Sequence, residues 1–313
     1  MKEEIKSLDS VLGDAKDRYF SYGFSKFHFQ IQTYELLVPN QLIGTLSVCY
    51  DGPQRPQQQS VHLGSMEYVS IGLFLVEGIL IKQKRLTKDE INRSLVSSLS
   101  MNIKNSHFLN TKLDIPFEAT ITNSKLDLSA INVGLTTIQL KIRDAILQIV
   151  IDHPGPTHIK HQDFQRWPTA ENSLHQKEYK KRLLKFDHIK LDRLNESITA
   201  QLQHPQEYSS HTWGLSAYNN PLTCLDSIRV SGQLMQVLLY SILATNRNEC
   251  PNIWLRSMEV ALGRPYRSSV YQVELKFIRR QQSLLRGQTW QTVQLNSQIG
   301  NLNATYKICH EMP

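Results

Sequence analysis

Two strongly apolar segments of the chain repeat each other at a fixed spacing, and this repeat restricts the possible folds more than any other feature. Residues 62–80 align without a gap with residues 221–239, so that each position matches the one 159 residues later. The pairs include Leu63 with Leu222, Met66 with Leu225, Glu67 with Asp226, Val69 with Ile228, Leu75 with Leu234 and Ile79 with Leu238. Apolar residues are common in helices, so the recurring carboxylate is the more informative match. The repeat predicts a duplicated unit.

The elements around each apolar helix also follow a similar order. In the first half, segments that alternate between apolar and polar residues lie at 27–33, 42–50, 117–122, 136–142 and 146–152. In the second half they lie at 186–191, 197–204, 253–261, 270–278, 290–295 and 304–309. Alternation of this kind predicts strands. The proline-containing stretch between the halves has no period, so we predict a first repeat with an N-terminal extension at 1–152, a linker at 153–176 and a second repeat at 177–313.

A helix that is apolar nearly all round must be enclosed, and strands joined by short turns favour an antiparallel sheet. We therefore expect an α+β protein of the double hotdog type, in which each repeat is a curved antiparallel sheet wrapped around one long helix. The two repeats would pair as a pseudo-dimer, so the chain is expected to be a monomer or a homodimer. Two unrelated α+β domains are the alternative. A capping box at Thr87–Glu90 predicts a further short helix at 87–99.

Composition and short motifs exclude several classes of function. The chain has 313 residues, a net charge of +7 and a pI of 9.1, which favours acidic partners without naming one. No nucleic-acid-binding motif accompanies this charge, and no 18-residue apolar run or signal peptide is present, so we expect a cytoplasmic protein that binds neither nucleic acid nor membrane. The four cysteines form no CxxC pair and are expected to be reduced thiols.

The sequence also gives no sign of a cofactor or a metal. It contains neither a P-loop nor GxGxxG, so no nucleotide cofactor is indicated. His153, His158, His161 and Asp163 cluster in the linker, but their spacing fits no tight metal site, and we expect them to be solvated.

Three motifs resemble the bacterial avirulence D family, and the similarity extends over nearly the whole chain. They are the opening at residues 12–24 (LGDAKDRYFSYGF), the helix entrance at 62–67 (HLGSME) and residues 186–192 (FDHIKLD). Members of that family are associated with acyl-sugar elicitors called syringolides, in which a β-ketoacyl chain is joined to a pentulose. This logic is similar to that of the A-factor synthases, which transfer a β-ketoacyl group to a triose phosphate. The resemblance implies a β-ketoacyl thioester on an acyl carrier protein as donor and a small sugar or polyol as acceptor.

The entrance to the second helix, residues 221–226 (PLTCLD), is similar to the Pro-x-x-x-x-Asp motif of polyketide-synthase dehydratases, in which the Asp is catalytic. Those enzymes pair this Asp with a His in a His-x-x-x-Gly-x-x-x-x-Pro motif of their first half. That motif is missing from this sequence. Dehydration is therefore in doubt, whereas acyl chemistry stays open.

Acyl transfer from a thioester to an alcohol needs a base, donors for the oxyanion and a dry channel for the chain. We take Glu67, Asp226, His62 and Arg229 as candidate catalytic residues. Each acid lies in the first turn of its helix, where the alternative role is to complement the helix dipole. His62 directly precedes the first helix, where an imidazole suits proton transfer. Arg229 shares one helical stripe with Asp226 and would either pair with it or hold a substrate carbonyl or phosphate.

Small and polar residues around the two helix starts are candidates for substrate binding. They are Gly64, Ser65, Ser70, Thr223, Cys224, Gln233 and His211. Cys224 lies at a helix N-terminus, a setting that lowers a thiol pKa and could make it a covalent acyl carrier, although a buried, inert thiol is the alternative. If only one of the two related sites works, the more polar second helix is favoured. The basic run 180–182 with Lys185, and residues 279–280, would receive an acidic carrier protein or form ordinary solvated surface.

Three functions compete on these grounds. The first is an acyl-transfer enzyme of secondary metabolism that joins a β-ketoacyl group to a hydroxyl of a small sugar. The second is a thioesterase or dehydratase on the same fold. The third is a non-catalytic module that binds an acyl chain or a lactone.

Overall fold

The computed structural model describes residues 2–37, 40–52, 63–104, 112–127, 133–155, 167–168, 170–205, 207–218, 222–247, 249–250, 253–265, 267–285 and 287–312. The N-terminal segment contains β1 (Lys2–Ile5), α1 (Asp9–Leu12) and the 3-10 helices η1 (Ala15–Asp17) and η2 (Gly23–Lys26). The first half follows with β2 (Phe27–Leu37), β3 (Gln41–Tyr50), α2 (Ser65–Lys84), α3 (Lys88–Arg93), β4 (Leu95–Ile103), β5 (Lys112–Asp127), β6 (Val133–Ile142) and β7 (Ala145–Pro154). The second half has η3 (Glu178–Lys181), β8 (Phe186–Asp192), β9 (Ser197–Gln203), α4 (Cys224–Leu243), β10 (Ile253–Leu262), β11 (Val270–Leu285), β12 (Gln288–Ile299) and β13 (Leu302–Glu311).

Thirteen strands of the described chain form one antiparallel sheet, and its order shows the duplication directly. From one edge the order is β1-β8-β9-β11-β12-β13-β10-β4-β7-β6-β5-β3-β2. The second half therefore repeats the first, with β8, β9, β11, β12, β13 and β10 in the places of β2, β3, β5, β6, β7 and β4. The halves join where β10 pairs with β4, with Met258 opposite Met101. The expected double hotdog is confirmed.

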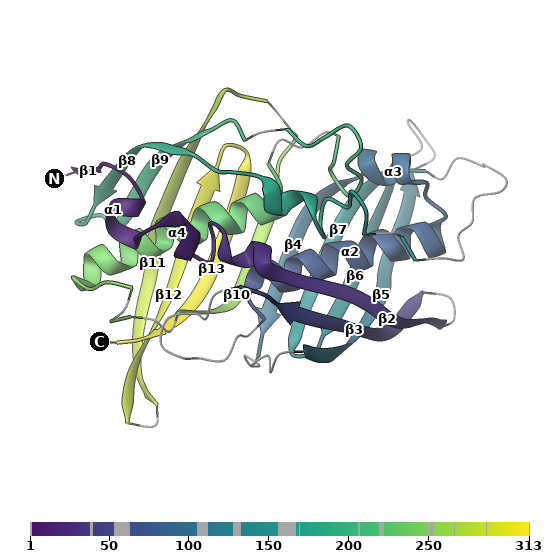
Figure 1. Ribbon diagram of the computed structural model, residues 1–313, viewed down its shortest axis with the longest axis horizontal. Helices are drawn as coiled ribbons and strands as arrows, with labels where there is room; N and C mark the ends of the chain where they lie inside the picture. The colour runs from purple at the N-terminus through teal and green to yellow at the C-terminus, as the bar shows by residue number, and fades with distance from the viewer. Residues whose placement is uncertain are drawn as a thin grey trace.

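Each half encloses one long helix on the same face of the sheet (Figure 1). Residues 65–81 of α2 are all buried, which explains why this segment is apolar on every side. Gly72 lets α2 approach the sheet, because a Cβ there would lie 2.9 Å from Leu147 Cδ2. Within the described residues, no helix combines the length and the apolar character that a membrane crossing requires.

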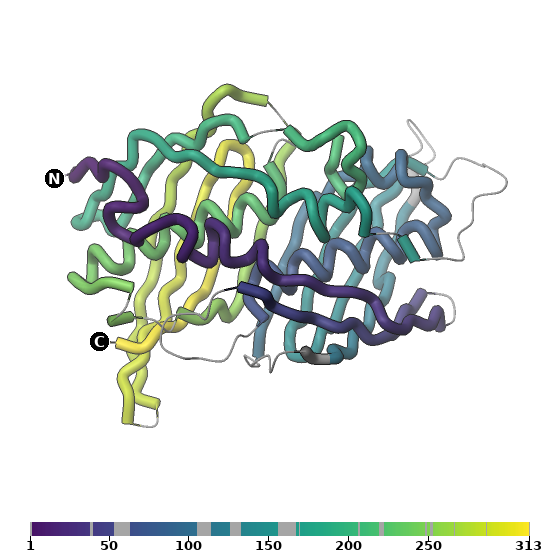
Figure 2. The backbone as a smooth tube through the Cα atoms, in the orientation of Figure 1, coloured from purple at the N-terminus to yellow at the C-terminus, as the bar shows by residue number. Residues whose placement is uncertain are grey.

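The N-terminal segment crosses from one half to the other. β1 pairs with β8 at one edge of the sheet, whereas β2 forms the opposite edge. Figure 2 shows the chain between them passing over the helix-bearing face. Phe20, in the middle of this crossing, packs on α4, where a Cβ at Gly232 would lie 2.7 Å from its ring. The crossing brings residues near position 20 to the junction of the halves.

Two expectations about local structure were wrong. The helix expected at 87–99 ends at Arg93, because residues from Leu95 onward enter β4 and pair with both β7 and β10. His153, expected to be solvated, is buried in β7, where its Nε2 lies 2.8 Å from Thr136 Oγ1. The other residues of that expected cluster, His158, His161 and Asp163, lie outside the described residues.

Candidate functional site

The two repeated acids lie at the N-termini of α2 and α4, and each closes a capping box. The Gly64 amide donates to Glu67 Oε2 at 2.8 Å, and the Thr223 amide donates to Asp226 Oδ2 at 2.9 Å. A capping-box acid binds the free amide at the start of its own helix, which explains why both copies retain a carboxylate there. Both side chains are nevertheless buried, at 1% and 2% exposure, so neither is an ordinary surface cap.

Glu67 has a second partner that comes from the N-terminal crossing. The Tyr19 hydroxyl donates a hydrogen bond to Glu67 Oε2, the same oxygen that accepts from the Gly64 amide. A side chain at position 64 would collide with this hydroxyl, so the approach of Tyr19 requires glycine there. Phe20 packs edge-on against Tyr19, with ring centroids 4.9 Å apart. The Gly64 amide and the Tyr19 hydroxyl are therefore two of the groups that hold the first-helix acid.

Asp226 is held by a guanidinium instead. Arg182 Nη1 donates to Asp226 Oδ2 at 2.7 Å, and the Thr223 hydroxyl donates to the same oxygen at 3.0 Å. The two charged side chains are at most 3% exposed. Arg182 was expected to lie in a basic surface run, and this expectation was wrong, because the side chain turns inward to neutralise a buried carboxylate.

Arg229 does not make the pair with Asp226 that its position on the helix indicated. Its Nη2 donates to the Arg182 carbonyl at 2.9 Å and its Nε to the Phe20 carbonyl at 3.4 Å, while its guanidinium carbon lies 4.6 Å from the centre of the Phe24 ring. Its Nη1 is buried and has no hydrogen-bond partner among the described residues. Desolvation by burial lowers the pKa of this guanidinium.

One segment, residues 170–182, connects these groups, and we call it the strap. Ser70 on α2 donates to the strap carbonyl of His175, and Lys180 Nζ donates to the Phe27 carbonyl of β2. At the end of the strap, Arg182 donates a hydrogen bond to Asp226 on α4. It therefore spans from the middle of one central helix to the N-terminus of the other.

The strap is fixed to α2 by a buried pair that the sequence analysis missed. His175 Nδ1 lies 2.6 Å from Glu77 Oε1, and the side chains are 2% and 0% exposed. The same Glu77 oxygen accepts from the Leu215 amide at 2.8 Å. Gly214 has φ 143° and a Cβ there would lie 2.6 Å from Glu77 Oε1, so only glycine fits. The signal in the sequence was Glu77 itself, a charge in the middle of an apolar helix.

Lys180 on the strap has an unusual electrostatic setting. Burial lowers its pKa to about 8, although the nearby Glu67 carboxylate acts in the opposite direction. An amine with such a pKa is present in both protonation states near neutral pH. Lys180, like Tyr19 and Arg182, was not among the residues expected at the site.

The residues expected to bind substrate fall into three groups. Ser65, Thr223 and Cys224 are buried at the two helix starts, where Gly64 is half-buried, and Ser70 and Gln233 are buried further along the helices. Several of them already make hydrogen bonds within the protein. For example, Gln233 Nε2 donates to the Arg229 carbonyl at 3.3 Å. His211 is exposed and lines a separate hollow of about 370 Å³ beside Lys88 and Trp213, away from the helix junction. His62 lies outside the described residues.

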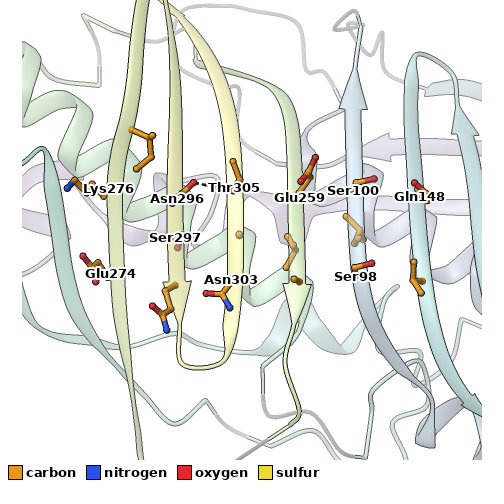
Figure 3. A pocket seen from close by; sticks show the side chains of 17 residues that line it. Ser98, Ser100, Gln148, Glu259, Glu274, Lys276, Asn296, Ser297, Asn303 and Thr305 are labelled. Atoms are coloured by element: carbon orange, nitrogen blue, oxygen red, sulfur yellow. Dashed lines mark hydrogen bonds between the residues drawn. The ribbon is translucent and has the colours of Figure 1, made fainter. Parts of the chain in front are cut away.

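A larger hollow lies on the sheet face opposite the helices. It has a volume of about 750 Å³ and crosses the strands where the halves join. Figure 3 shows Glu259, Lys276, Asn296 and Gln148 on this face, with the helices behind the sheet. None of the residues that surround Glu67 or Asp226 lines it. It is therefore separate from the candidate site.

Cys224 is expected to be unreactive, contrary to the acyl-carrier hypothesis. The helix N-terminus favours a thiolate, but burial dominates and raises the thiol pKa to about 12. At pH 8 only about one thiol in 10⁴ would be ionised. In native protein, labelling with a thiol reagent should therefore reach the half-buried Cys49 and Cys309 well before Cys224, and peptide mass spectrometry can assign the labels. Fast labelling of Cys224 that disappears in Cys224→Ser would refute this expectation.

Comparison with known proteins gives one family and several distant structures. The model of the family described as Pseudomonas avirulence D protein matches residues 3–313. No curated protein matches the chain. Among solved structures, a Mycobacterium avium tesB protein is 9% identical with a TM-score of 0.38, covering 90% of this chain and 96% of its own. A pyran synthase domain from the sorangicin pathway is 8% identical with a TM-score of 0.43, covering 90% and 97%. The dehydratase domain of the CurJ module of curacin polyketide synthase is 11% identical with a TM-score of 0.40, covering 90% and 96%.

Proposed function

Because the chain belongs to the avirulence D family, we propose that it transfers a β-ketoacyl group from an acyl-carrier-protein thioester to a hydroxyl of a small sugar. One structural observation carries the proposal. The buried acids Glu67 and Asp226 lie at the starts of the two central helices, and the strap and the N-terminal crossing connect them in one polar cluster. Buried titratable groups at the junction of two units are typical of catalytic sites.

In this proposal Glu67 is the general base. It removes a proton from the acceptor hydroxyl, whose oxygen forms a bond to the thioester carbonyl carbon. The carbon–sulfur bond then breaks, and the proton passes from Glu67 to the departing thiolate. Tyr19, bonded to Glu67 Oε2, orients the carboxylate, and Lys180 lies where a positive charge stabilises it. The free amides at the helix starts supply partial positive charge for the oxyanion.

The choice of Glu67 departs from the sequence argument, which favoured the second helix. Asp226 Oδ2 already accepts from the Thr223 amide, the Thr223 hydroxyl and the Arg182 guanidinium. These three bonds, one of them from a buried guanidinium, suit a fixed structural charge, so the proposal does not use Asp226 as the base. Glu67 Oε2 accepts from the Gly64 amide and the Tyr19 hydroxyl, and we propose this carboxylate as the base.

Two alternatives use the same cluster. A thioesterase would use water in place of the sugar hydroxyl, and a dehydratase would act at the β-carbon of the acyl chain. The similarity of residues 221–226 to a dehydratase motif favours the second of these, but Arg182 holds the corresponding Asp226 as an ion pair. A non-catalytic module that binds an acyl chain would need neither acid.

An acidic carrier protein remains the proposed donor partner. Of the basic residues assigned to its docking, Arg182 is buried and Lys180 is half-buried, so neither belongs to a docking surface. Lys181, Lys185 and Arg279 are exposed and stay candidates. They would attract the carrier mainly by long-range electrostatics.

The test is mass spectrometry of products from purified protein, β-ketoacyl carrier protein and a panel of pentuloses, triose phosphates and simple polyols. An ester mass that requires both substrates would support transfer. Free β-keto acid would indicate a thioesterase, and an enoyl product from a 3-hydroxyacyl carrier protein would indicate a dehydratase. A donor that binds tightly and stays unchanged would identify a binding module.

A further inference from the structure

Three buried hydrogen-bond donors at the junction of the halves make no hydrogen bond of normal geometry. They are Arg229 Nη1, the Tyr179 hydroxyl and the Tyr208 hydroxyl. Within the described part of the chain Arg229 Nη1 has no partner, and the two hydroxyls have only the nearby Ser70 and Thr223 hydroxyls, outside normal hydrogen-bond geometry. Leaving a buried donor unpaired is unfavourable, and more so when the donor is charged. Three such groups close together therefore indicate a site whose acceptor is a ligand.

The contacts around these donors place them in one cluster. Arg229 stacks on Phe24, and Phe24 stacks on Tyr179 with ring centroids 5.6 Å apart. The Arg182 guanidinium carbon lies 4.1 Å from the centre of the Tyr208 ring, and the Arg182 carbonyl accepts from Arg229. Arg229 also lies near enough to both hydroxyls to act on them electrostatically. The guanidinium of Arg229 therefore lies near both tyrosines.

The cluster contains more cationic than anionic side chains. Its cations are Lys180, Arg182 and Arg229, and its carboxylates are Glu67 and Asp226. Asp226 is bonded to Arg182 and acts on Arg229 only through space, so the direct contacts described for Arg229 are carbonyl oxygens and an aromatic face. A buried cation whose nearest carboxylate is already paired with another guanidinium keeps part of its desolvation penalty, and a bound anion would reduce that penalty.

We propose that Arg229, Tyr179 and Tyr208 bind an oxyanion, a phosphate or a carboxylate, carried by the small acceptor. Charge-assisted bonds from a guanidinium and two hydroxyls suit such a group, whereas a neutral polyol leaves the excess positive charge in place. The assignment of the anion to the acceptor rests on the proposed function, but the anion site itself does not. Tyr179 is also close to Glu67, so an acceptor anchored here presents its hydroxyls toward the proposed base.

The test compares ligand-induced stabilisation without any acyl donor. Melting temperature is measured against concentration for inorganic phosphate, a pentulose 5-phosphate, the unphosphorylated pentulose and the corresponding pentonate, with sodium chloride matching the ionic strength. A ligand that binds only the folded state raises stability in proportion to the logarithm of its concentration above Kd. We expect the phosphate or the carboxylate sugar to stabilise the protein and the neutral sugar to have little effect.

Variants then assign the effect to the cluster. Tyr179→Phe and Tyr208→Phe keep the ring packing, and Arg229→Gln removes the charge; we expect anion affinity to fall about 10- to 100-fold in Arg229→Gln and less in each Phe variant. Lys307→Gln, an exposed change on the sheet, should leave it unchanged. Equal affinity in all variants, or equal stabilisation by neutral and anionic sugars, would overturn the proposal. Anion binding without an ester product would instead refute only acyl transfer, and efficient transfer to a neutral pentulose would refute the assignment of the anion to the acceptor.

Discussion

Replacing Arg182 with Met is expected to lower the free energy of unfolding by about 3–5 kcal/mol, because it leaves a buried carboxylate without its charged partner. The Arg182–Asp226 pair is 2.7 Å long and at most 3% exposed, so water cannot take over the lost bond. Met fills a volume similar to that of Arg, so the expected decrease in the free energy of unfolding comes from the lost charge and not from a cavity. Urea denaturation followed by circular dichroism measures the change.

The neighbouring lysine provides a matched control. Lys181 is the last residue of η3 and directly precedes Arg182, but its side chain is 71% exposed, and Lys181→Met should change the free energy of unfolding by less than about 0.5 kcal/mol. The double variant Arg182→Met/Asp226→Leu should recover part of the stability, because it removes the stranded carboxylate. If Arg182→Met were as stable as Lys181→Met, the ion pair would have no structural role.

The sequence predicted the fold well wherever one local pattern decided the structure. The buried central helices are apolar on most sides and the strands alternate, so both could be identified from residue order alone. The strand β4 could not be identified in this way, because Leu95 and Leu99 continue the helical spacing that starts at the Thr87 capping box. Their structure is decided by pairing with β7 and β10, which are distant in sequence. Tertiary contacts therefore overrode a local helix signal.

The candidate site was predictable only in part, for a related reason. Glu67 and Asp226 were found because duplication places them at equivalent helix positions. Their partners carry no such signal, since Tyr19 is 48 positions from Glu67 and Arg182 is 44 positions from Asp226. The His175–Glu77 pair spans 98 positions. These partners belong to the N-terminal crossing and the strap. Both segments lie outside the repeated elements, so the duplication gives no information about the partners.

Replacing Glu67 with Gln is expected to lower kcat for acyl transfer by about 10²- to 10⁴-fold, the usual contribution of a general base. The amide still accepts hydrogen bonds from Gly64 and Tyr19, so the helix start should persist, but it cannot take a proton from the acceptor. Tyr19→Phe should reduce kcat less, because it removes only the group that orients the base. Steady-state ester formation measured by mass spectrometry, with carrier-protein donor in excess, gives both values.

Glu90→Gln tests whether this loss comes from chemistry or from a damaged helix cap. Glu90 is also a capping-box acid, 1% exposed, and its Oε2 accepts from the Thr87 amide at 2.7 Å, but it belongs to α3. The two substitutions make the same chemical change in similar surroundings, so they should cost similar stability while only Glu67→Gln loses turnover. If both variants lost turnover in proportion to stability, Glu67 would be a structural cap. If Glu67→Gln kept full turnover while Asp226→Asn lost it without unfolding, the base would lie on the second helix, as the polar stripe of α4 first indicated.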